Sequence, residues 1–327
     1  FQFAQRAGDT KLAAKYGVTK TYASHLELAA DKTIDAVGVS ASFVAQSTVA
    51  CDCLRAGKAV FMEKPMAVSV AQAEKMLAAE RAGKGRLMVA YMKRYDAGNE
   101  IVKATVDGFR KSGELGPVTF MRNHGFCGAQ WNAGSSNPFL NSDEPYPPDV
   151  DAASHYPAWL PADRRNAYVG YLQQYTHNVN LLRWLTDAGD VAVKFVDLDA
   201  TDGISGIAVL DVGGVRTTIE SGSMSHWGWD EHTQVYFRDG WVRTEAPPLL
   251  LKNVPASVEV YRAGKTQSMA ALRPGESGDR WSWSYQREAA HFIECVRTGT
   301  PFRSSGADTL HDVRTFEMIY KAFLKIA

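Results

Sequence analysis

The chain has 327 residues, and its 36 basic and 36 acidic side chains give a formal net charge of +0. This length is enough for two domains with substantial cores, and the charge balance excludes the basic surface with which proteins bind nucleic acid or anionic membranes. No apolar run approaches the length that spans a bilayer, so no membrane segment is expected.

The four cysteines are few for this length and lack the spacing of a metal site. Cys51 and Cys53 lie two positions apart within a predicted helix and therefore point to different sides. The pattern predicts reduced core thiols of a cytoplasmic protein, with no bound metal.

Helices and strands are predicted to alternate in the N-terminal third of the chain. Residues 1–17 have the apolar spacing of a helix, with no strand before them. The β-branched run 34–40 predicts a central parallel strand, which needs neighbours on both sides. A helix over about 46–56 connects it to a second buried strand, 59–62, so these elements form a β-α-β unit.

The second strand leads into Glu63-Lys64-Pro65, two opposite charges and a proline directly after a buried run. Pro65 keeps Lys64 out of helical geometry, so both charges lie in a stiff segment at the carboxyl end of the strand. A capping box at Ser69 opens the next helix, and the run 86–92 predicts a third strand. If the strands are parallel, their carboxyl ends meet at the edge where open α/β sheets bind ligands. That edge would present Ser40, Ser42, Glu63, Lys64, Lys93, Arg94 and Tyr95.

Glycine and proline breaks near residue 116 predict a domain boundary, with a nucleotide-binding domain at 1–116 and a substrate-binding and oligomerisation domain at 117–327. Residues 118–124 alternate between two strand faces, one of which carries His124. The segment 127–166 is predicted to be a long insertion that serves as a lid, binding loop or subunit contact, with disorder as the alternative. Its aromatic anchors are Trp131, Tyr146 and Trp159.

A helix predicted over about 168–186 carries two neighbouring stripes. One stripe is apolar and predicts core packing; the other contains Gln173, His177, Asn180 and Trp184. Because the second stripe is polar but nearly uncharged, it favours a partly buried site over a solvated face. The alternative is a hydrogen-bonded core histidine, the commoner state of a lone histidine.

From residue 191 the pattern changes to short strands, with hairpin turns at Gly213-Gly214 and Asp239-Gly240 and two closing helices over about 283–298 and 309–325. The expected fold class is therefore α/β with a parallel sheet, followed by an α+β domain with a large, mostly antiparallel open sheet. The tryptophans predict an aromatic sheet face that another subunit covers; they are Trp227, Trp229, Trp241, Trp281 and Trp283.

Four motifs occur in order along the chain: Asp35-Ala36-Val37, the run from Gly57 to Pro65, Lys93-Arg94-Tyr95, and the run from His177 to Leu185. Together they resemble the glucose-fructose oxidoreductase and inositol dehydrogenase family (Gfo/Idh/MocA), and the resemblance covers nearly the whole chain. It implies a Rossmann domain followed by an antiparallel sheet domain. It also implies that NAD or NADP, with NAD favoured, lies along the strand ends and that a sugar or cyclitol lies between the domains. The matching lysine and histidine would carry the hydride chemistry.

The chain departs from the family pattern at three places. The family opens with a strand, a Gly-x-Gly-x-x-Gly turn, a helix and a second strand, and no such glycine turn precedes Lys11, so an incomplete Rossmann domain is expected. Either a longer protein or a truncation that cannot hold nucleotide would explain this. Ala41-Ser42 stands for the family's Thr-Pro, and Gln46 for a histidine. Gln173 stands for an acid one helical turn before His177, and an amide orients an imidazole without stabilising its charge.

We expect His177 to be the general base, because its ordinary pKa lies near the working pH. Lys64 is expected to hydrogen-bond the reacting oxygen and stabilise developing negative charge, while Glu63 holds Lys64 or contacts the nicotinamide ribose. The expected cofactor-binding residues are Ser40, Ala41, Ser42, Gln46, Glu63, Lys64 and Lys93. The expected substrate-binding residues are Lys93, Tyr95, His124, Trp131, Gln173, His177 and Asn180.

The predicted function is that of an NAD(P)-dependent oxidoreductase acting on a secondary hydroxyl of a sugar, glycoside or cyclitol, with the 3-hydroxyl of a glucoside as a candidate. Two alternatives stay open: a redox-assisted, NAD-dependent glycosidase, and a nucleotide-free binding or regulatory homologue. The expected partners are a small carbohydrate or polyol and further copies of the chain, in a dimer or tetramer. Neither nucleic acid nor a membrane is expected, and the predicted location is the cytoplasm.

Overall fold

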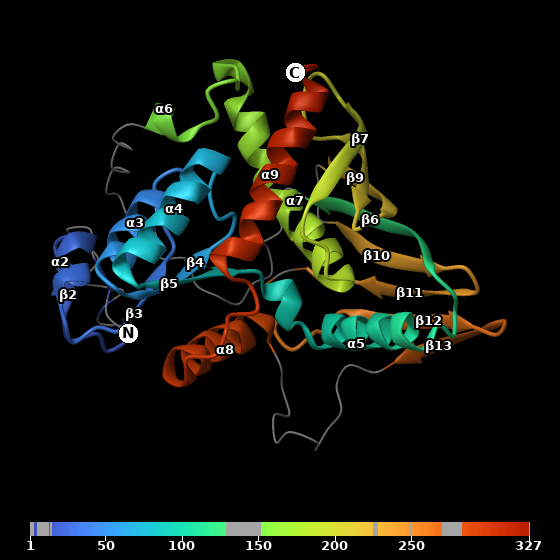
Figure 1. The fold of residues 1–327 in the computed structure, drawn as a ribbon, viewed down its shortest axis with the longest axis horizontal. Helices are drawn as coiled ribbons and strands as arrows, with labels where there is room; N and C mark the ends of the chain where they lie inside the picture. Colours follow the sequence, from blue (N-terminus) through green and yellow to red (C-terminus); the bar gives the residue numbers. More distant parts are fainter. Residues whose placement is uncertain are drawn as a thin grey trace.

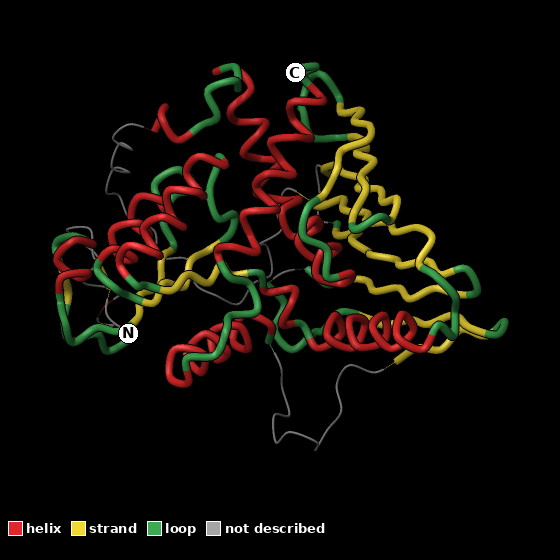
Figure 2. The backbone as a smooth tube through the Cα atoms, viewed as in Figure 1, coloured by secondary structure: helices red, strands yellow, loops and turns green. Residues whose placement is uncertain are grey.

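The two larger of the three sheets in the described residues lie on opposite sides of the molecule, with the long helices α7 (Arg165–Thr186) and α9 (Gly306–Phe323) between them (Figure 1). The smaller of these two, a parallel sheet, comes from the first third of the chain and the larger sheet from the rest (Figure 1), and Figure 2 shows their strands in yellow on the two sides of the helices. This arrangement confirms the expected fold class. The structure is a computed structural model that describes residues 3–4, 13, 15–128, 152–224, 228–248, 250–269 and 283–326.

The parallel sheet has the strand order β3 (Ala36–Val39), β4 (Ala59–Glu63) and β5 (Arg86–Ala90). Helices α3 (Gln46–Arg55) and α4 (Val70–Gly83) pack against each other beside it. β4 and β5 are mostly buried, which explains their nearly unbroken apolar runs, whereas β3 is the edge strand of the described sheet and is partly exposed. The predicted β-α-β unit and third strand are confirmed.

The first residues differ from the prediction. Phe3–Ala4 form a short strand, β1, that pairs in parallel with β2 (Thr21–Tyr22), so a strand precedes the helical residues Ala13 and Lys15. The expectation of a helix from residue 1 was wrong, because a two-residue strand is too short to show an alternating pattern. Helix α2 (His25–Ala30) follows.

A 3-10 turn, η1 (Met92–Tyr95), leads from β5 into helix α5 (Ala97–Ser112). The Asp96 carboxylate caps α5 by accepting hydrogen bonds from the backbone amides of Gly98 and Asn99, at 2.8 and 3.1 Å. Gly98 lets this first turn approach the chain before β12, since a Cβ there would lie 2.0 Å from a backbone oxygen. Helix α8 (Ser284–Thr298) packs against η1 and β4.

The large sheet has the order β13-β12-β11-β10-β6-β9-β8-β7. Its neighbouring strands are antiparallel except for β6 and β9, which are parallel, so the sheet is mostly antiparallel as predicted. The last strand, β13, was not predicted. The strands are β6 (Val118–Gly128), β7 (Val191–Leu198), β8 (Gly206–Val212), β9 (Val215–Met224), β10 (Trp229–Phe237), β11 (Gly240–Glu245), β12 (Ser257–Arg262) and β13 (Lys265–Met269).

Helices α5, α7 and α9 contact one face of this sheet. On β6 the inward positions include Met121 and Asn123, which are buried, while Arg122 and His124 on the outward positions are partly exposed. The β8–β9 hairpin turns at Gly213 and Gly214, both with positive φ, as predicted.

The predicted insertion begins slightly later than expected, because β6 extends to Gly128. The segment then contains α6 (Ala152–His155) and the 3-10 turn η2 (Ala162–Arg164). Trp131 and Tyr146 lie outside the described residues. Trp159 packs against the helices, and its Nε1 donates to Glu317 at 3.2 Å. No helix in the described ranges is long and apolar enough to cross a membrane.

Candidate active site

Lys64 lies at the carboxyl end of β4 and reaches helix α7. Its Nζ donates to the backbone oxygen of Gln173 at 3.0 Å, a residue 109 positions later in the chain. Gln173 is one helical turn before His177, so the ammonium group meets α7 beside that histidine. Burial lowers the pKa of Lys64 to about 8, and the neighbouring Glu63 carboxylate opposes this effect. A lysine that titrates there can exchange its proton near physiological pH.

His177 is 3% exposed, and neither ring nitrogen has a hydrogen-bond partner among the described residues. Burial lowers the pKa of His177 well below its ordinary value, and the positive charges of Lys64 and Lys93 lower it further. The Tyr91 ring lies edge-on to the imidazole, with centroids 6.0 Å apart. His177 is therefore a neutral imidazole whose buried nitrogens can bind a substrate hydroxyl. Its pKa is lower than the ordinary value assumed from the sequence, because the helix is buried.

Lys93, in η1, is buried and contacts the carboxylate of Glu231 on β10. Burial and the Lys64 ammonium lower the pKa of Lys93, whereas the Glu231 carboxylate favours its charged form. Asn178, the residue after His177, donates to the same Glu231 oxygen at 3.3 Å. The structure thus brings Lys64, Lys93 and His177 to one buried centre and adds a carboxylate.

Glu231 was missed in the sequence analysis. Strand β10 alternates, and Glu231 shares the inward positions with Thr233 and Val235. A charged residue on the apolar positions of a strand is the signal that would have identified it.

The carboxyl ends of β3 and β4 meet at the expected sheet edge. Ser40 and Ala41 are exposed there, and Glu63 is partly buried with a pKa raised by burial. The Ser42 hydroxyl oxygen accepts a hydrogen bond from the backbone amide of Ala45 at 3.2 Å, which shapes the turn into α3.

Gln46 has a different role from the one expected. It is fully buried, and its side-chain amide donates to the backbone oxygen of Pro65. Gln46 therefore holds the segment that carries Lys64, and its other amide atom, Oε1, has no partner in the described part of the chain.

His124 lies on the opposite face of the large sheet from His177. Its Nδ1 is 2.7 Å from the Glu220 carboxylate, and its ring stacks on His232 with centroids 4.8 Å apart. The sequence predicted the alternation of β6 correctly but not which face points inward, and Asn123 takes the inward position.

Tyr95 and Asn180 also lie away from the centre. The η1 turn directs Tyr95 into the packing of α8, where the guanidinium of Arg303 lies over its ring. Asn180 uses both amide atoms within the protein, accepting from Arg94 at 2.6 Å and donating to Asp312 at 2.7 Å. Both side chains are therefore engaged in contacts within the protein.

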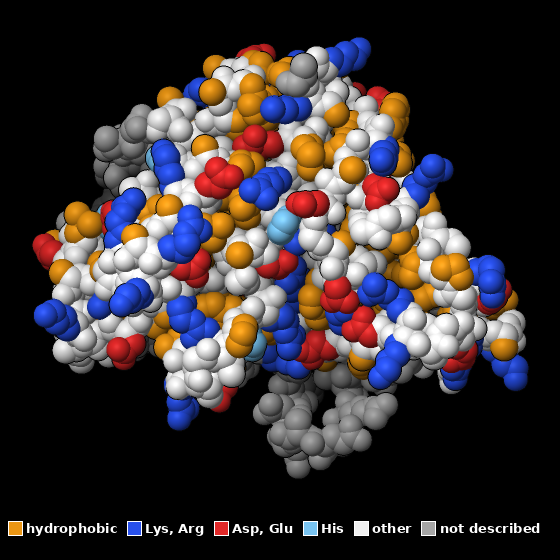
Figure 3. Space-filling view, viewed as in Figure 1, with side chains coloured by type: hydrophobic (Ala, Val, Ile, Leu, Met, Phe, Trp, Pro, Cys, Tyr) orange, Lys and Arg blue, Asp and Glu red, His pale blue; other side chains and the backbone are white. Residues whose placement is uncertain are grey.

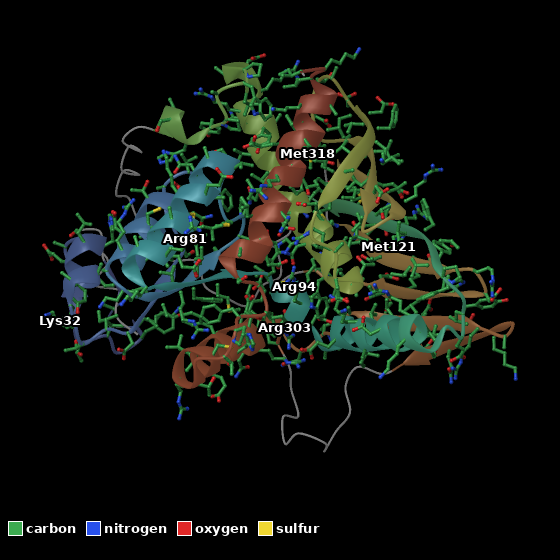
Figure 4. The ribbon with its side chains drawn as sticks, in the orientation of Figure 1. Lys32, Arg81, Arg94, Met121, Arg303 and Met318 are labelled. Carbon is green, nitrogen blue, oxygen red and sulfur yellow. The ribbon has the colours of Figure 1, made fainter. Side chains whose placement is uncertain are left out.

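Asn180 belongs to a cluster of ion pairs that joins α7, α9 and η1. Arg94 lies 2.7 Å from Asp308, which also accepts from Arg183 at 2.8 Å. Figure 4 shows Arg94 close to Arg303, whose backbone oxygen it contacts at 2.8 Å. Figure 3 shows basic and acidic side chains side by side near the centre of the visible face. Because each arginine here has carboxylate or carbonyl partners, the cluster stabilises the packing of α7, α9 and η1.

Comparison with known proteins adds the family. The model of the "Oxidoreductase family, NAD-binding Rossmann fold" (GFO_IDH_MocA) matches residues 3–91. Inositol 2-dehydrogenase of Salmonella typhimurium is 38% identical over 104 residues, which are 31% of this chain and 30% of the relative. Myo-inositol 2-dehydrogenase of Thermotoga maritima is 22% identical over 311 residues, covering 90% of this chain and 79% of the relative.

Among solved structures, aldose-aldose oxidoreductase from Caulobacter crescentus shares the fold with a TM-score of 0.73 and 20% identity, over 99% of this chain and 88% of that one. The match to the Salmonella enzyme spans 30% of that enzyme's length. Residues 3–91 therefore match the NAD-binding Rossmann part of the Gfo/Idh/MocA oxidoreductase family, and the whole chain is similar in fold to a solved oxidoreductase.

Proposed function

We propose that the protein is an NAD(P)-dependent dehydrogenase that transfers hydride between nicotinamide and a secondary hydroxyl of a sugar or polyol. The observation that carries this proposal is the buried centre formed by Lys64 and His177. One group comes from a strand end of the parallel sheet and the other from α7, and the Lys64 contact with Gln173 O at 3.0 Å holds them together. Both groups have pKa values lowered by burial, as proton-handling groups in active sites commonly do.

The sheet edge beside Lys64 has the chemistry to hold the nicotinamide end of the cofactor. Ser40 and Ala41 are exposed at the end of β3, and the Glu63 carboxylate lies next to Lys64, so hydroxyl, backbone and carboxylate groups are available for a ribose. Gln46 supports this segment, because its side-chain amide N–H donates to the backbone oxygen of Pro65. When bound, the nicotinamide accepts or donates the hydride.

In the oxidation direction, a neutral His177 nitrogen accepts the hydroxyl proton as hydride leaves the same carbon, and a carbonyl results. Lys64 donates a hydrogen bond to the reacting oxygen and stabilises its negative charge. Burial, and then the charges of Lys64 and Lys93, lower the pKa of His177 and make its imidazolium a stronger acid. His177 therefore returns its proton readily, which favours the reverse reaction, reduction of a ketone.

A polyol or sugar is the substrate class that the site chemistry favours. The centre is lined by charged and amide groups, namely Lys64, Lys93, Asn178 and Glu231, which suit several hydroxyls better than an apolar alcohol. Relatives named for inositol and for aldoses support the same class. Oxidation of a glucoside at its 3-hydroxyl is one specific form of this proposal.

The test is an absorbance assay of nicotinamide reduction by the purified protein, using NAD and NADP separately. The panel contains myo-inositol, glucose, methyl glucosides and, as a control, an apolar secondary alcohol. We expect reduction with at least one polyol and none with the apolar alcohol. Absence of reduction with every polyol, or equal activity with the apolar alcohol, would contradict the proposal.

We also propose that the protein forms a homo-oligomer through the face of the large sheet that α5, α7 and α9 leave uncovered. Aromatic pairs lie on this side, including Phe120 with Tyr236 and Trp241 with Tyr261, whose ring centroids are 6.1 and 5.8 Å apart. Such a surface suits burial in an interface. Sedimentation of the protein as a monomer at micromolar concentration would contradict this.

The four free thiols support a cytoplasmic location.

A further inference from the structure

Strand β10 carries two buried polar atoms that no partner in the described residues satisfies. Glu231 is 3% exposed, and its Oε2 atom has no hydrogen-bond partner there. Trp229, two positions earlier on the same inward face, has a buried Nε1 that also has no partner in those residues. One acceptor and one donor thus stand on adjacent inward positions, a pattern that suits the hydroxyl groups of a polar ligand.

Glu231 lies close to the reacting groups. Its other oxygen, Oε1, contacts Lys93 and accepts from Asn178, which follows His177 in the chain. The Lys93 charge in turn acts on the pKa of His177, and the Lys64 charge acts on that of Lys93. The carboxylate is therefore linked to the His177 region through Lys93 and through Asn178, the next residue on α7.

The pairing of Glu231 differs from that of a structural carboxylate in the same sheet. Glu220, on β9, has both oxygens occupied by Arg122, at 2.8 and 2.7 Å, and a further contact from His124. A buried ion pair stabilises a fold only when its remaining atoms are also satisfied. Glu231 is more deeply buried than Glu220, and yet its Oε2 atom has no partner in the described residues. This pairing fits a carboxylate that binds a ligand better than one that only forms a structural ion pair.

We propose that Glu231 determines substrate specificity by accepting a hydrogen bond from a second hydroxyl of the polyol, on a carbon near the one that is oxidised. Lys93 and Asn178 hold the carboxylate in place, and Trp229 offers its indole N–H or ring to the same end of the substrate. This inference rests on the proposed function and adds the requirement that the substrate carry two hydroxyls at neighbouring positions.

The test measures binding separately from turnover. Affinities of the purified protein for methyl glucoside, its singly deoxygenated analogues and myo-inositol are measured by calorimetry, for the wild type, Glu231→Gln and Glu220→Gln. A hydrogen bond to a charged group corresponds to about a 10- to 150-fold loss in affinity when one hydroxyl is removed. We expect one deoxy analogue to show this loss in the wild type and in Glu220→Gln, and to bind Glu231→Gln within about threefold of its parent.

Equal discrimination by the wild type and Glu231→Gln would overturn the inference, as would a wild type that binds every deoxy analogue as well as the parent. The double variant Lys93→Met/Glu231→Gln removes both charges of the pair and replaces the single variant if that one does not fold. Binding with Glu231-dependent discrimination but without nicotinamide reduction would refute the proposed function and leave only the binding role of Glu231 supported. A wild type that reduces nicotinamide without that discrimination would support the proposed function and overturn the inference about Glu231. Failure to bind any of these ligands would overturn both.

Discussion

Replacing Lys64 with methionine is expected to stabilise the protein near neutral pH while removing its activity. Methionine keeps the length and apolar stem of the side chain but carries no charge. The buried ammonium of Lys64 is disfavoured in the folded protein, which is why its pKa falls from 10.5 to about 8. This difference corresponds to about 3 kcal/mol of unfolding free energy at a pH below both values.

The hydrogen bond from Lys64 to the backbone oxygen of Gln173 offsets part of that penalty, by about 1 kcal/mol. Near pH 7 the variant should therefore exceed the wild type by about 2 kcal/mol. Between about pH 8 and 10.5 the unfolded wild type binds more protons at this position than the folded protein, so wild-type stability rises through this window. The advantage of the variant should consequently disappear by about pH 10.5.

The measurement is urea denaturation of both proteins at a series of pH values, followed by circular dichroism. Lys75→Met, at an exposed position on α4, serves as the matched control and should show no such pH-dependent difference. A Lys64→Met protein that is less stable than the wild type near neutral pH would refute the reasoning. A stability difference that stays constant from about pH 7 to 10.5 would refute it as well.

Four further substitutions test other parts of the structure. Asn180→Leu should lower the unfolding free energy by about 1 to 3 kcal/mol without changing KM, because its amide connects two buried charged groups; a changed KM with unchanged stability would assign it to substrate. Gln173→Glu should raise the pKa of His177 toward its ordinary value and move the acidic limb of the pH profile of kcat/KM to higher pH; an unmoved limb would separate the two side chains. Lys64→Arg should remove the alkaline limb near pH 8, because a guanidinium stays charged there, so a retained limb would assign it to another group. Tyr175→Phe should lower the unfolding free energy by about 1 to 3 kcal/mol, measured by urea denaturation, because its buried hydroxyl lies 3.1 and 2.9 Å from backbone oxygens of β6 and β9 and accepts from the Gly222 amide at 2.8 Å; an unchanged midpoint would contradict this.

Local patterns predicted the parts of the fold and site that depend on neighbouring residues in the chain. The strand ending at Glu63 and Lys64 follows from a buried run and a proline, and the helix that carries His177 follows from its two stripes. Their approach was expected from the family resemblance and from the rule that parallel strand ends meet at one edge.

The remaining site residues depend on tertiary packing, which periodicity does not report. His124 and Asn123 alternate on β6, and only the packing of α7 decides that Asn123 points inward. Asn180 lies on a helix that is buried on almost every side, so its polar stripe faces α9 and contacts Asp312. Glu231 comes from a strand far along the sequence, and no local pattern connects it to Lys93.

The pKa of His177 shows the same limit. From the sequence alone, an ordinary histidine near neutral pH was the reasonable assumption. The structure buries the ring and places two lysines near it, and both effects disfavour the charged form. The pKa of a buried titrating group such as His177 thus depends strongly on its tertiary neighbours as well as on its residue type.

The most direct test of the central claim, that Lys64 and His177 act as one proton-handling unit, is a double-mutant cycle in kcat/KM for the best polyol of the panel. Lys64→Met and His177→Asn should each lower kcat/KM by about 100-fold or more, and the double variant should be little worse than either single variant, because the two groups serve one step. Near-full activity in either single variant, or losses that multiply in the double variant, would contradict the claim.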